Sequence, residues 1–338
     1  MSALQPLPSA VLPPPPSPPG SRAPGGLITG TALLTWRRQR LGEGGRAADL
    51  DWLLDLGAGL RWTQLQRVWL DPAAAVRLHA GLEELTALWR QHLESHTPLQ
   101  YLVGVCPWRE FSLAVSPAVL IPRQETEVLA DLAVALAQAL PSPAHRPLTW
   151  ADLGTGSGCL ALALAHSLPQ ARGLVTDCSL QALEQAAINF QQAALLDRLT
   201  LHQGQWWDPL RVHWGSLDLV VSNPPYIPTA VLEALEPVVK EHEPHLALDG
   251  GPDGLDAIRV LAAGARSALA PGGWLLLEHH HDQSEAVTEL LLSGGLVEVT
   301  SHRDLEGRWR FAQARRAMPA PSHRPGPAGP QSDSAEQP

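Results

Sequence analysis

The sequence is poor in lysine and has no excess of positive charge. Lys240 is its only lysine, and 24 basic residues stand against 34 acidic ones, which gives a net charge of -10. The acidic excess lies within residues 99–316, where 14 basic groups accompany 24 acids. Proteins that follow a nucleic-acid backbone need a broad basic surface. The composition therefore argues against such binding, and we expect no direct nucleic-acid specificity.

Cysteine is also scarce, and long apolar runs are missing. The three cysteines, Cys106, Cys159 and Cys178, are odd in number and lack the spacing of a metal or redox motif. No apolar run reaches the roughly 18 residues that a membrane span needs. The N-terminus has neither a signal-peptide pattern nor the arginine content of a transit peptide. We expect a cytoplasmic protein with no membrane segment and no bound metal.

The two ends of the chain are biased in composition. Residues 1–27 contain the run Pro13 to Pro16, and residues 317–338 are rich in proline, serine and glycine. Segments of this kind bury too little apolar surface to fold. We therefore predict a disordered leader at 1–27 and a disordered tail at 317–338.

Residues 28–98 have the pattern of a small helical domain. Leu50, Leu53 and Leu54 stand at helical spacing, and Asp71-Pro72 is typical of the first turn of a further helix. An apolar stripe for that helix consists of Leu78, Leu82, Leu85, Trp89 and Leu93. Four more tryptophans, namely Trp36, Trp52, Trp62 and Trp69, are expected to pack in its core. The alternative is that some of them face a protein partner.

Residues 99–122 have the pattern of a β-hairpin linker. Phe111, Leu113 and Val115 alternate with small residues, and a second short apolar run follows at residues 119–122. We predict that these two runs pair. Residues 123–127 then open a helix that ends before Pro141.

The rest of the chain, residues 123–316, alternates strand and helix patterns. Strands are predicted at 148–153, 173–176, 199–202, 217–221, 273–278, 297–300 and 309–314. Helices are predicted at 158–167, 179–196, 256–269 and 283–293. Such alternation indicates a mainly parallel sheet with helices on both faces. The fold class is therefore α/β, with a seven-stranded Rossmann-like sheet that a small helical domain and a hairpin linker precede.

A glycine-rich turn follows the first predicted strand of this sheet. It consists of Gly154, Thr155, Gly156, Ser157 and Gly158, with G-x-G-x-G spacing and a helix after it. Glycine lets the backbone turn sharply and approach a ligand, and N–H groups at a helix start favour an anion. The turn is a candidate cofactor site, and its alternative is a tight strand-to-helix connection.

Three side chains near the ends of the next two strands could complete a cofactor site. Asp177 is placed to accept hydrogen bonds from both hydroxyls of a ribose, although an acid there can also cap a helix. Gln205 and Trp206 could contact the edge and face of an adenine, although Trp206 is equally consistent with packing. Without a phosphate-binding lysine, this set favours S-adenosylmethionine over a nucleotide.

The sequence Asn223-Pro224-Pro225-Tyr226 ends the fourth predicted strand of the sheet. Two prolines stop the strand and stiffen the backbone, and the residue before a proline is pushed towards extended geometry. The Asn223 carboxamide, the Pro224 carbonyl and the Tyr226 ring could then hold a planar group that carries an NH2. A plain proline-rich turn is the alternative.

Together these motifs resemble the PrmC/HemK family of protein-(glutamine-N5) methyltransferases over residues 28–316. The similar segments are 98–104, 120–127, 223–227, 243–248 and 250–255. The resemblance implies an S-adenosylmethionine-dependent enzyme that methylates the glutamine amide nitrogen of the Gly-Gly-Gln motif in peptide chain release factors. It implies substrate recognition by residues 28–98 and catalysis by residues 123–316.

The resemblance also assigns roles to residues. Asn223, Pro224 and Tyr226 would be catalytic, and Pro225 would join them in binding the substrate. The cofactor would contact the glycine-rich turn, Asp177, Trp206 and Asn223.

Three departures from the family's pattern concern a turn, the adenine site and one loop. Gln124 replaces a proline and Gln205 replaces an acid. His279-His280-His281 replace a glycine-containing sequence, and we expect these histidines to form an exposed loop.

Two other functions stay open from the residues alone. One is methylation of adenine N6 in DNA or RNA, because the same shelf grips an exocyclic NH2. The other is a cofactor-binding protein without activity.

Overall fold

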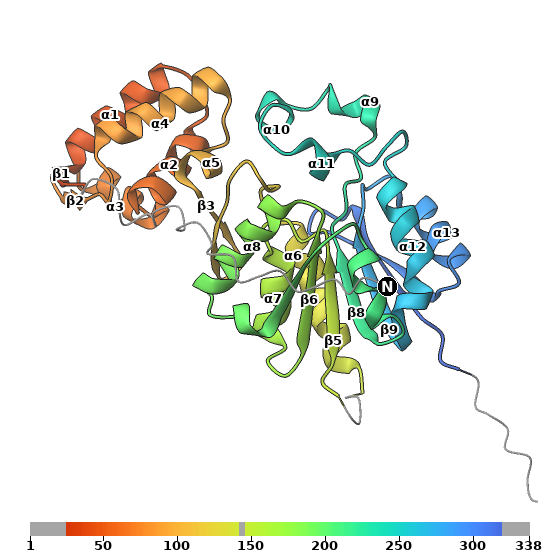
Figure 1. Cartoon of the computed structure of the whole chain (residues 1–338). Coiled ribbons are helices and arrows are strands. Elements are labelled where there is room, and N and C mark those ends of the chain that lie inside the picture. Colours follow the sequence, from red (N-terminus) through yellow and green to blue (C-terminus); the bar gives the residue numbers. More distant parts are fainter. Residues whose placement is uncertain (1–24, 142–145, 320–338) are drawn as a thin grey trace, which may run out of the picture.

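The computed structural model describes residues 25–141 and 146–319, which form a helical domain beside a larger α/β domain (Figure 1). The predicted disordered leader and tail lie almost wholly outside these residues. Within the described ranges, no helix is both long enough and apolar enough to cross a membrane.

The N-terminal domain packs four helices around a leucine-rich core. They are α1 (Gly30–Gly42), α2 (Ala47–Ala58), α3 (Trp62–Leu70) and α4 (Leu82–Ser95). A short antiparallel pair, β1 (Leu27–Thr29) and β2 (Ala75–Arg77), closes the domain. The prediction of a helix start at Asp71-Pro72 is wrong. Asp71 is the C-cap of α3, and α4 begins only at Leu82, because the residues between them pair with β1.

The tryptophans of this domain are less buried than expected. Trp36 is buried, but Trp52, Trp62 and Trp69 are 38%, 49% and 40% exposed. Leucines and Trp89 fill the core instead. The rings of Trp62 and Trp69 meet edge to face at 5.1 Å, and the Arg37 guanidinium lies 5.6 Å above the Trp69 ring. The prediction of an aromatic core is therefore wrong for three of the four.

The linker contains a hairpin, but its strands differ from the predicted pair. After α5 (Leu99–Val103), β3 (Val105–Trp108) pairs with β4 (Phe111–Ala114). The second predicted run, residues 119–122, is not a strand. The buried Asn189 side chain ties the hairpin to the α/β domain, since its Oδ1 accepts from Ala114 N at 2.7 Å and its Nδ2 donates to Ala114 O and Ser157 O.

The seven predicted strands of the α/β domain form one sheet. They are β5 (Thr149–Leu153), β6 (Arg172–Asp177), β7 (Leu199–Gln203), β8 (Leu217–Ser222), β9 (Leu269–Glu278), β10 (Val297–Arg303) and β11 (Trp309–Arg315). The order is β10-β11-β9-β8-β5-β6-β7, and β11 runs antiparallel to both of its neighbours. The chain passes from β5 outward to β7 and then returns to β8 on the other side. This reversal leaves a crevice at the carboxyl ends of β5 and β8, where α/β proteins bind ligands.

Helices cover both faces of the sheet, as the alternating pattern predicts. One apolar core joins the sheet to α6 (Thr126–Ala139), α7 (Cys159–Ser167) and α8 (Leu180–Gln192). A second core joins the opposite face to α12 (Asp256–Ala268) and α13 (Ser284–Ser293). Two 3-10 turns, η2 (Leu196–Arg198) and η3 (Asp208–His213), flank β7. The strands therefore stand in a rigid frame that fixes the loops at their ends.

A segment between β8 and α12 folds into three short helices that the sequence did not predict. They are α9 (Thr229–Leu232), α10 (Pro237–Lys240) and α11 (His245–Leu248), and they stand near the helical domain (Figure 1). His242 Nε2 lies 2.6 Å from Ser95 O of the helical domain. The Glu243 carboxylate accepts from Arg123 Nη2 at 2.7 Å and from Ile121 N at 3.3 Å. These contacts join the segment to the linker and to the first domain.

Candidate active site

A cavity of about 400 Å³ opens at the carboxyl ends of β5, β6 and β8. Its size is that of a site for a small molecule or cofactor. Eight of the predicted site residues line it: Gly154, Thr155, Gly156, Ser157, Asp177, Trp206, Asn223 and Pro225. Gly158, Pro224 and Tyr226 stand outside this lining. The cavity therefore brings the glycine-rich turn and the end of β8 into one site.

The glycine-rich turn is held against the end of β6 by backbone hydrogen bonds. Gly154 N and Thr155 N both donate to Thr176 O, at 2.9 and 3.0 Å. Gly154 and Gly156 have φ angles of +75° and +54°, a region that L side chains rarely adopt. A Cβ on Gly154 would lie 3.2 Å from the Trp206 ring. A residue with a side chain at Gly154 would therefore be strained and would crowd the Trp206 ring.

Gly158 has a packing position rather than a place on the cavity wall. It is the N-cap of α7 with a φ of +82°, and a Cβ there would meet Phe190 Cε1 at 2.5 Å. Phe190 belongs to α8. This glycine lets α7 and α8 approach each other behind the turn.

Asp177 ends β6 with a buried carboxylate that faces the cavity. Its Oδ2 accepts from Gly156 N and its Oδ1 from Ser179 N, both at 2.9 Å. Ser179, not Asp177, is the N-cap of α8. Burial raises the pKa of Asp177, and the two N–H donors act against that rise. Each oxygen of an ionised carboxylate can accept more than one hydrogen bond, so Asp177 can also accept from hydroxyl groups of a ligand in the cavity.

Trp206 and Gln205 follow β7 and line the same cavity. Trp206 has a φ of +48°, which is uncommon for a residue other than glycine and marks a constrained backbone. Its ring lies beside Gly154, so the turn and the indole form one wall. The wall offers an apolar face next to the polar edge of Gln205.

The end of β8 is anchored to the neighbouring strand and to α6. Ser222 Oγ donates to Leu153 O at 2.6 Å, which joins β8 to the end of β5. Asn223 Nδ2 donates to Thr126 Oγ1 at 3.1 Å. Pro224 is buried. The Asn223 side chain therefore has a fixed neighbour on one side and the cavity on the other.

Glu278 lies behind this turn and was not predicted as a site residue. It is 1% exposed, and it accepts from Thr126 Oγ1 at 2.7 Å and from Tyr226 Oη at 3.2 Å. Burial raises its pKa to about 7, against the effects of Thr126, Arg310 and Tyr226. Burial also raises the pKa of Tyr226. Because Thr126 and Glu278 are 152 residues apart in sequence, no local spacing reveals this contact.

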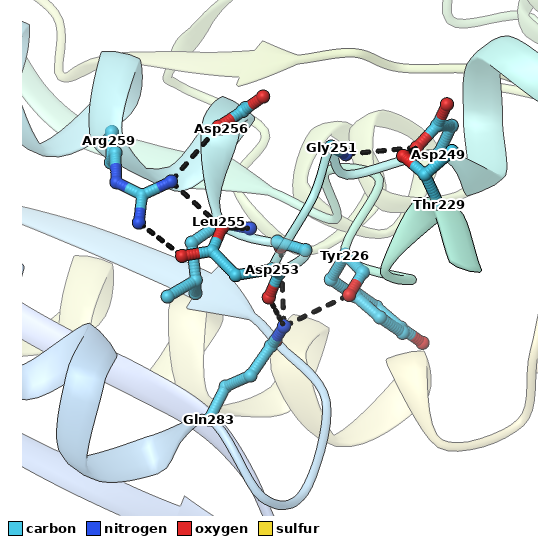
Figure 2. A network of polar contacts seen from close by, with 10 residues as sticks. Tyr226, Thr229, Asp249, Gly251, Asp253, Leu255, Asp256, Arg259 and Gln283 are labelled. Atoms are coloured by element: carbon cyan, nitrogen blue, oxygen red, sulfur yellow. Dashed lines mark hydrogen bonds and ion pairs between the residues drawn. The ribbon is translucent and has the colours of Figure 1, made fainter. Parts of the chain in front are cut away.

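Tyr226 of the Asn-Pro-Pro-Tyr turn joins a network of polar contacts with the loop after α11 and with Gln283, the N-cap of α13 (Figure 2). Gln283 Nε2 donates to the carbonyl oxygens of Tyr226 at 3.0 Å and of Asp253 at 3.3 Å. Asp249 Oδ1 accepts from Thr229 Oγ1 and Gly251 N, and Arg259 pairs with Asp253 (Figure 2). These bonds hold the backbone of the turn in one position.

The prediction that the three histidines after Glu278 form one exposed loop is wrong. His279 is fully buried and its N–H donates to Arg310 O, which extends the pairing of β9 with β11. His280 is half-buried beside Asp282, and His281 is exposed. Across residues 25–141 and 146–319, no group of three or more histidine, cysteine or acidic side chains is arranged to hold a metal ion.

The chain is similar to known proteins over most of its length. The family model "Methyltransferase small domain" matches residues 131–252. A release factor glutamine methyltransferase of Prochlorococcus marinus is 50% identical over 284 residues, which are 84% of this chain and 96% of that protein. One from a Synechocystis strain is 42% identical, over 86% of this chain and 98% of that protein. A solved protein-(glutamine-N5) methyltransferase (release factor-specific) from Alicyclobacillus acidocaldarius is 28% identical, covering 61% of this chain and 99% of its own, with a TM-score of 0.36.

Proposed function

The chain belongs to the release factor glutamine methyltransferase family, and we propose that it methylates the glutamine amide nitrogen of the Gly-Gly-Gln motif in release factors with S-adenosylmethionine. One observation carries the proposal: Asn223 shares a cavity with the glycine-rich turn and Asp177. A methyl donor bound at the glycine-rich turn would therefore share one site with the carboxamide of Asn223.

The polar groups that line the cavity are suited to S-adenosylmethionine. The amino-acid carboxylate would lie against the turn at Gly154 and Gly156, where a side chain would be excluded or strained. Asp177 would accept the two ribose hydroxyls with its remaining acceptor positions. Trp206 would cover the adenine face, and Gln205 can accept from the adenine amino group where the family has an acid. When bound, the cofactor supplies an electrophilic methyl group.

Residues 223–226 would hold the substrate amide. Asn223 Oδ1 and the Pro224 carbonyl accept the two amide hydrogens, which turns the nitrogen lone pair towards the methyl group. Tyr226, anchored through its hydroxyl at Glu278, keeps the turn from rotating, and Pro225 lines the cavity. Held between Asn223 and Pro224, the substrate nitrogen would face the methyl group that the cofactor supplies, and it would lose one proton to water on gaining that methyl group. Orientation of this kind lowers a barrier by several kcal/mol.

The helical domain would recognise the release factor. Trp62 and Trp69 expose a paired aromatic surface next to Arg37, which is the composition of a protein-binding hot spot. The three described cysteines are free, which fits the reducing cytoplasm where we place the protein.

Transfer of a labelled methyl group from S-adenosylmethionine tests the proposal against its alternative. We expect label in a purified release factor and none in single-stranded or duplex nucleic acid. Label in nucleic acid alone would favour adenine methylation, which the acidic charge and the names of the relatives do not support. Cofactor binding without any transfer would indicate an inactive protein.

A further inference from the structure

We infer that Thr126 and Glu278 are positioning residues, which orient the Asn223 carboxamide so that its oxygen, not its NH2 group, faces the substrate. The inference rests on the proposed function and names residues that act through Asn223. It concerns three side chains joined by hydrogen bonds, namely Thr126 of α6, Glu278 of β9 and Asn223 at the end of β8, which we call the relay.

The hydrogen bonds of the relay are continuous, and two of its three side chains are shielded from water. Asn223 Nδ2 donates to Thr126 Oγ1 at 3.1 Å, and Thr126 Oγ1 donates to Glu278 Oε2 at 2.7 Å. Thr126 is 2% exposed and Glu278 is 1% exposed. Buried polar groups need all of their hydrogen bonds, since an unmade one is costly. The pattern of donors along this chain is therefore strongly constrained.

The carboxylate sets the direction of every bond in the chain. Tyr226 Oη donates to one oxygen of Glu278 and Thr126 Oγ1 to the other. Above the pKa of about 7 that burial gives Glu278, its carboxyl is ionised and only accepts hydrogen bonds. The single hydroxyl hydrogen of Thr126 is thereby used. Its oxygen can then only accept from Asn223, and only the NH2 end of a carboxamide can donate. The Asn223 oxygen must turn away from Thr126.

This direction matters because the two ends of a carboxamide have nearly the same shape. If the group turned over, its oxygen would face the oxygen of Thr126 without a hydrogen between them. Its NH2 would then meet the NH2 of the substrate glutamine, and two donors cannot pair. Thr126 and Asn223 both line the cavity, so the chain ends at the place where the acceptor is needed.

Five variants of the full-length protein test the inference with a release factor as substrate. Thr126→Val keeps the shape and removes the hydroxyl, and Thr126→Ser restores it. We expect kcat to fall about tenfold or more in Thr126→Val and to stay within about threefold of wild type in Thr126→Ser. The cofactor Kd should change by less than about twofold in both. Glu278→Gln can accept only one of its two donors, so its kcat should also fall.

Asn223→Ala and its double variant with Thr126→Val separate positioning from loss of structure. In an Asn223→Ala background, Thr126→Val should lower kcat no further, because the relay has nothing left to orient. A cumulative loss would overturn the inference. So would equal activity of Thr126→Val and wild type, or an equal loss in Thr126→Ser and Thr126→Val.

A readout without substrate keeps the inference testable if the proposed function fails. The side-chain NH2 protons of Asn223, assigned by their loss in Asn223→Ala, can be followed by NMR hydrogen exchange. We expect slow exchange in wild type and Thr126→Ser and fast exchange in Thr126→Val. Unchanged exchange in Thr126→Val would overturn the relay whatever the substrate is. Absence of methyl transfer by the wild type would overturn only the proposed function.

Discussion

Asp177 is the single side chain on which the cofactor assignment depends most. Its carboxylate already binds Gly156 N and Ser179 N, and it would take two ribose hydroxyls as well. Asp177→Asn keeps the shape but exchanges one oxygen for a donor. We expect the Kd for S-adenosylmethionine to rise about ten- to hundredfold, as measured by calorimetry. The exposed Asp197, changed to asparagine, is the matched control. Equal affinity in the two variants would contradict the assignment.

Glu278 gives the stability of the protein a defined pH dependence. Its carboxyl has an ordinary pKa of 4.5 and a folded value of about 7, because burial disfavours its charge. Between these values the folded protein holds a proton that the unfolded chain has released. This group therefore lowers the free energy of unfolding as the pH rises from about 4.5 to about 7.

Glu278→Gln removes this titration. Relative to wild type, we expect the free energy of unfolding of the variant to increase over that pH range and then to level off. Urea unfolding at a series of pH values measures the difference between the two proteins, in which the other titrating groups cancel. A difference that does not vary with pH would show that folding leaves the pKa of Glu278 at its ordinary value, and it would contradict the account of its burial.

The sequence predicts residues of this site that belong to local motifs and misses those that meet only in the fold. The glycine-rich turn and Asn223 were predicted because glycines or prolines follow an apolar strand there, and a few neighbouring residues show this pattern. Thr126 and Glu278 meet Asn223 and Tyr226 across separations of 97 and 52 residues. The sequence gives one local signal for Glu278, which is an acid at the end of an apolar strand, and none for Thr126.

At the scale of elements, Gly158 tests how α7 and α8 support the turn. Gly158→Ala adds a strained φ and a Cβ 2.5 Å from Phe190. We expect a loss of about 3 kcal/mol in the free energy of unfolding. Gly215, with a φ of +79° and no atom near its missing Cβ, isolates the strain alone. Gly215→Ala should cost only about 1 kcal/mol, and equal losses in urea unfolding would refute the packing role.

The strands of the sheet were predictable, whereas some helix limits were not. Apolar runs such as β8 and β9 are buried on both sides and stand out between turns. Asp71-Pro72 carries the letters of a helix start, but its place is set by the pairing of β2 with β1. The helices α9, α10 and α11 have four residues each, too few for any periodicity.

At the scale of the whole molecule, we expect the helical domain to bind the release factor and the cavity to bind the cofactor independently of each other. We expect the double variant Trp62→Ala and Trp69→Ala to raise KM for an intact release factor about tenfold, with the cofactor Kd unchanged. Trp309 is the matched control, because it is 40% exposed and carries Arg303 4.1 Å from its ring centroid on the α/β domain. Steady-state kinetics would contradict the proposal if Trp309→Ala and the double variant behaved alike.

Mass spectrometry of the release factor tests the central claim most directly. A release factor is incubated with S-adenosylmethionine and either the wild-type protein or Asn223→Ala, and the peptide that contains Gly-Gly-Gln is sequenced by fragmentation. Our account predicts one added methyl group on the glutamine side chain with the wild type, and at least about a hundredfold less with Asn223→Ala at equal cofactor occupancy. A methyl group on another residue, or equal methylation by the two proteins, would contradict it.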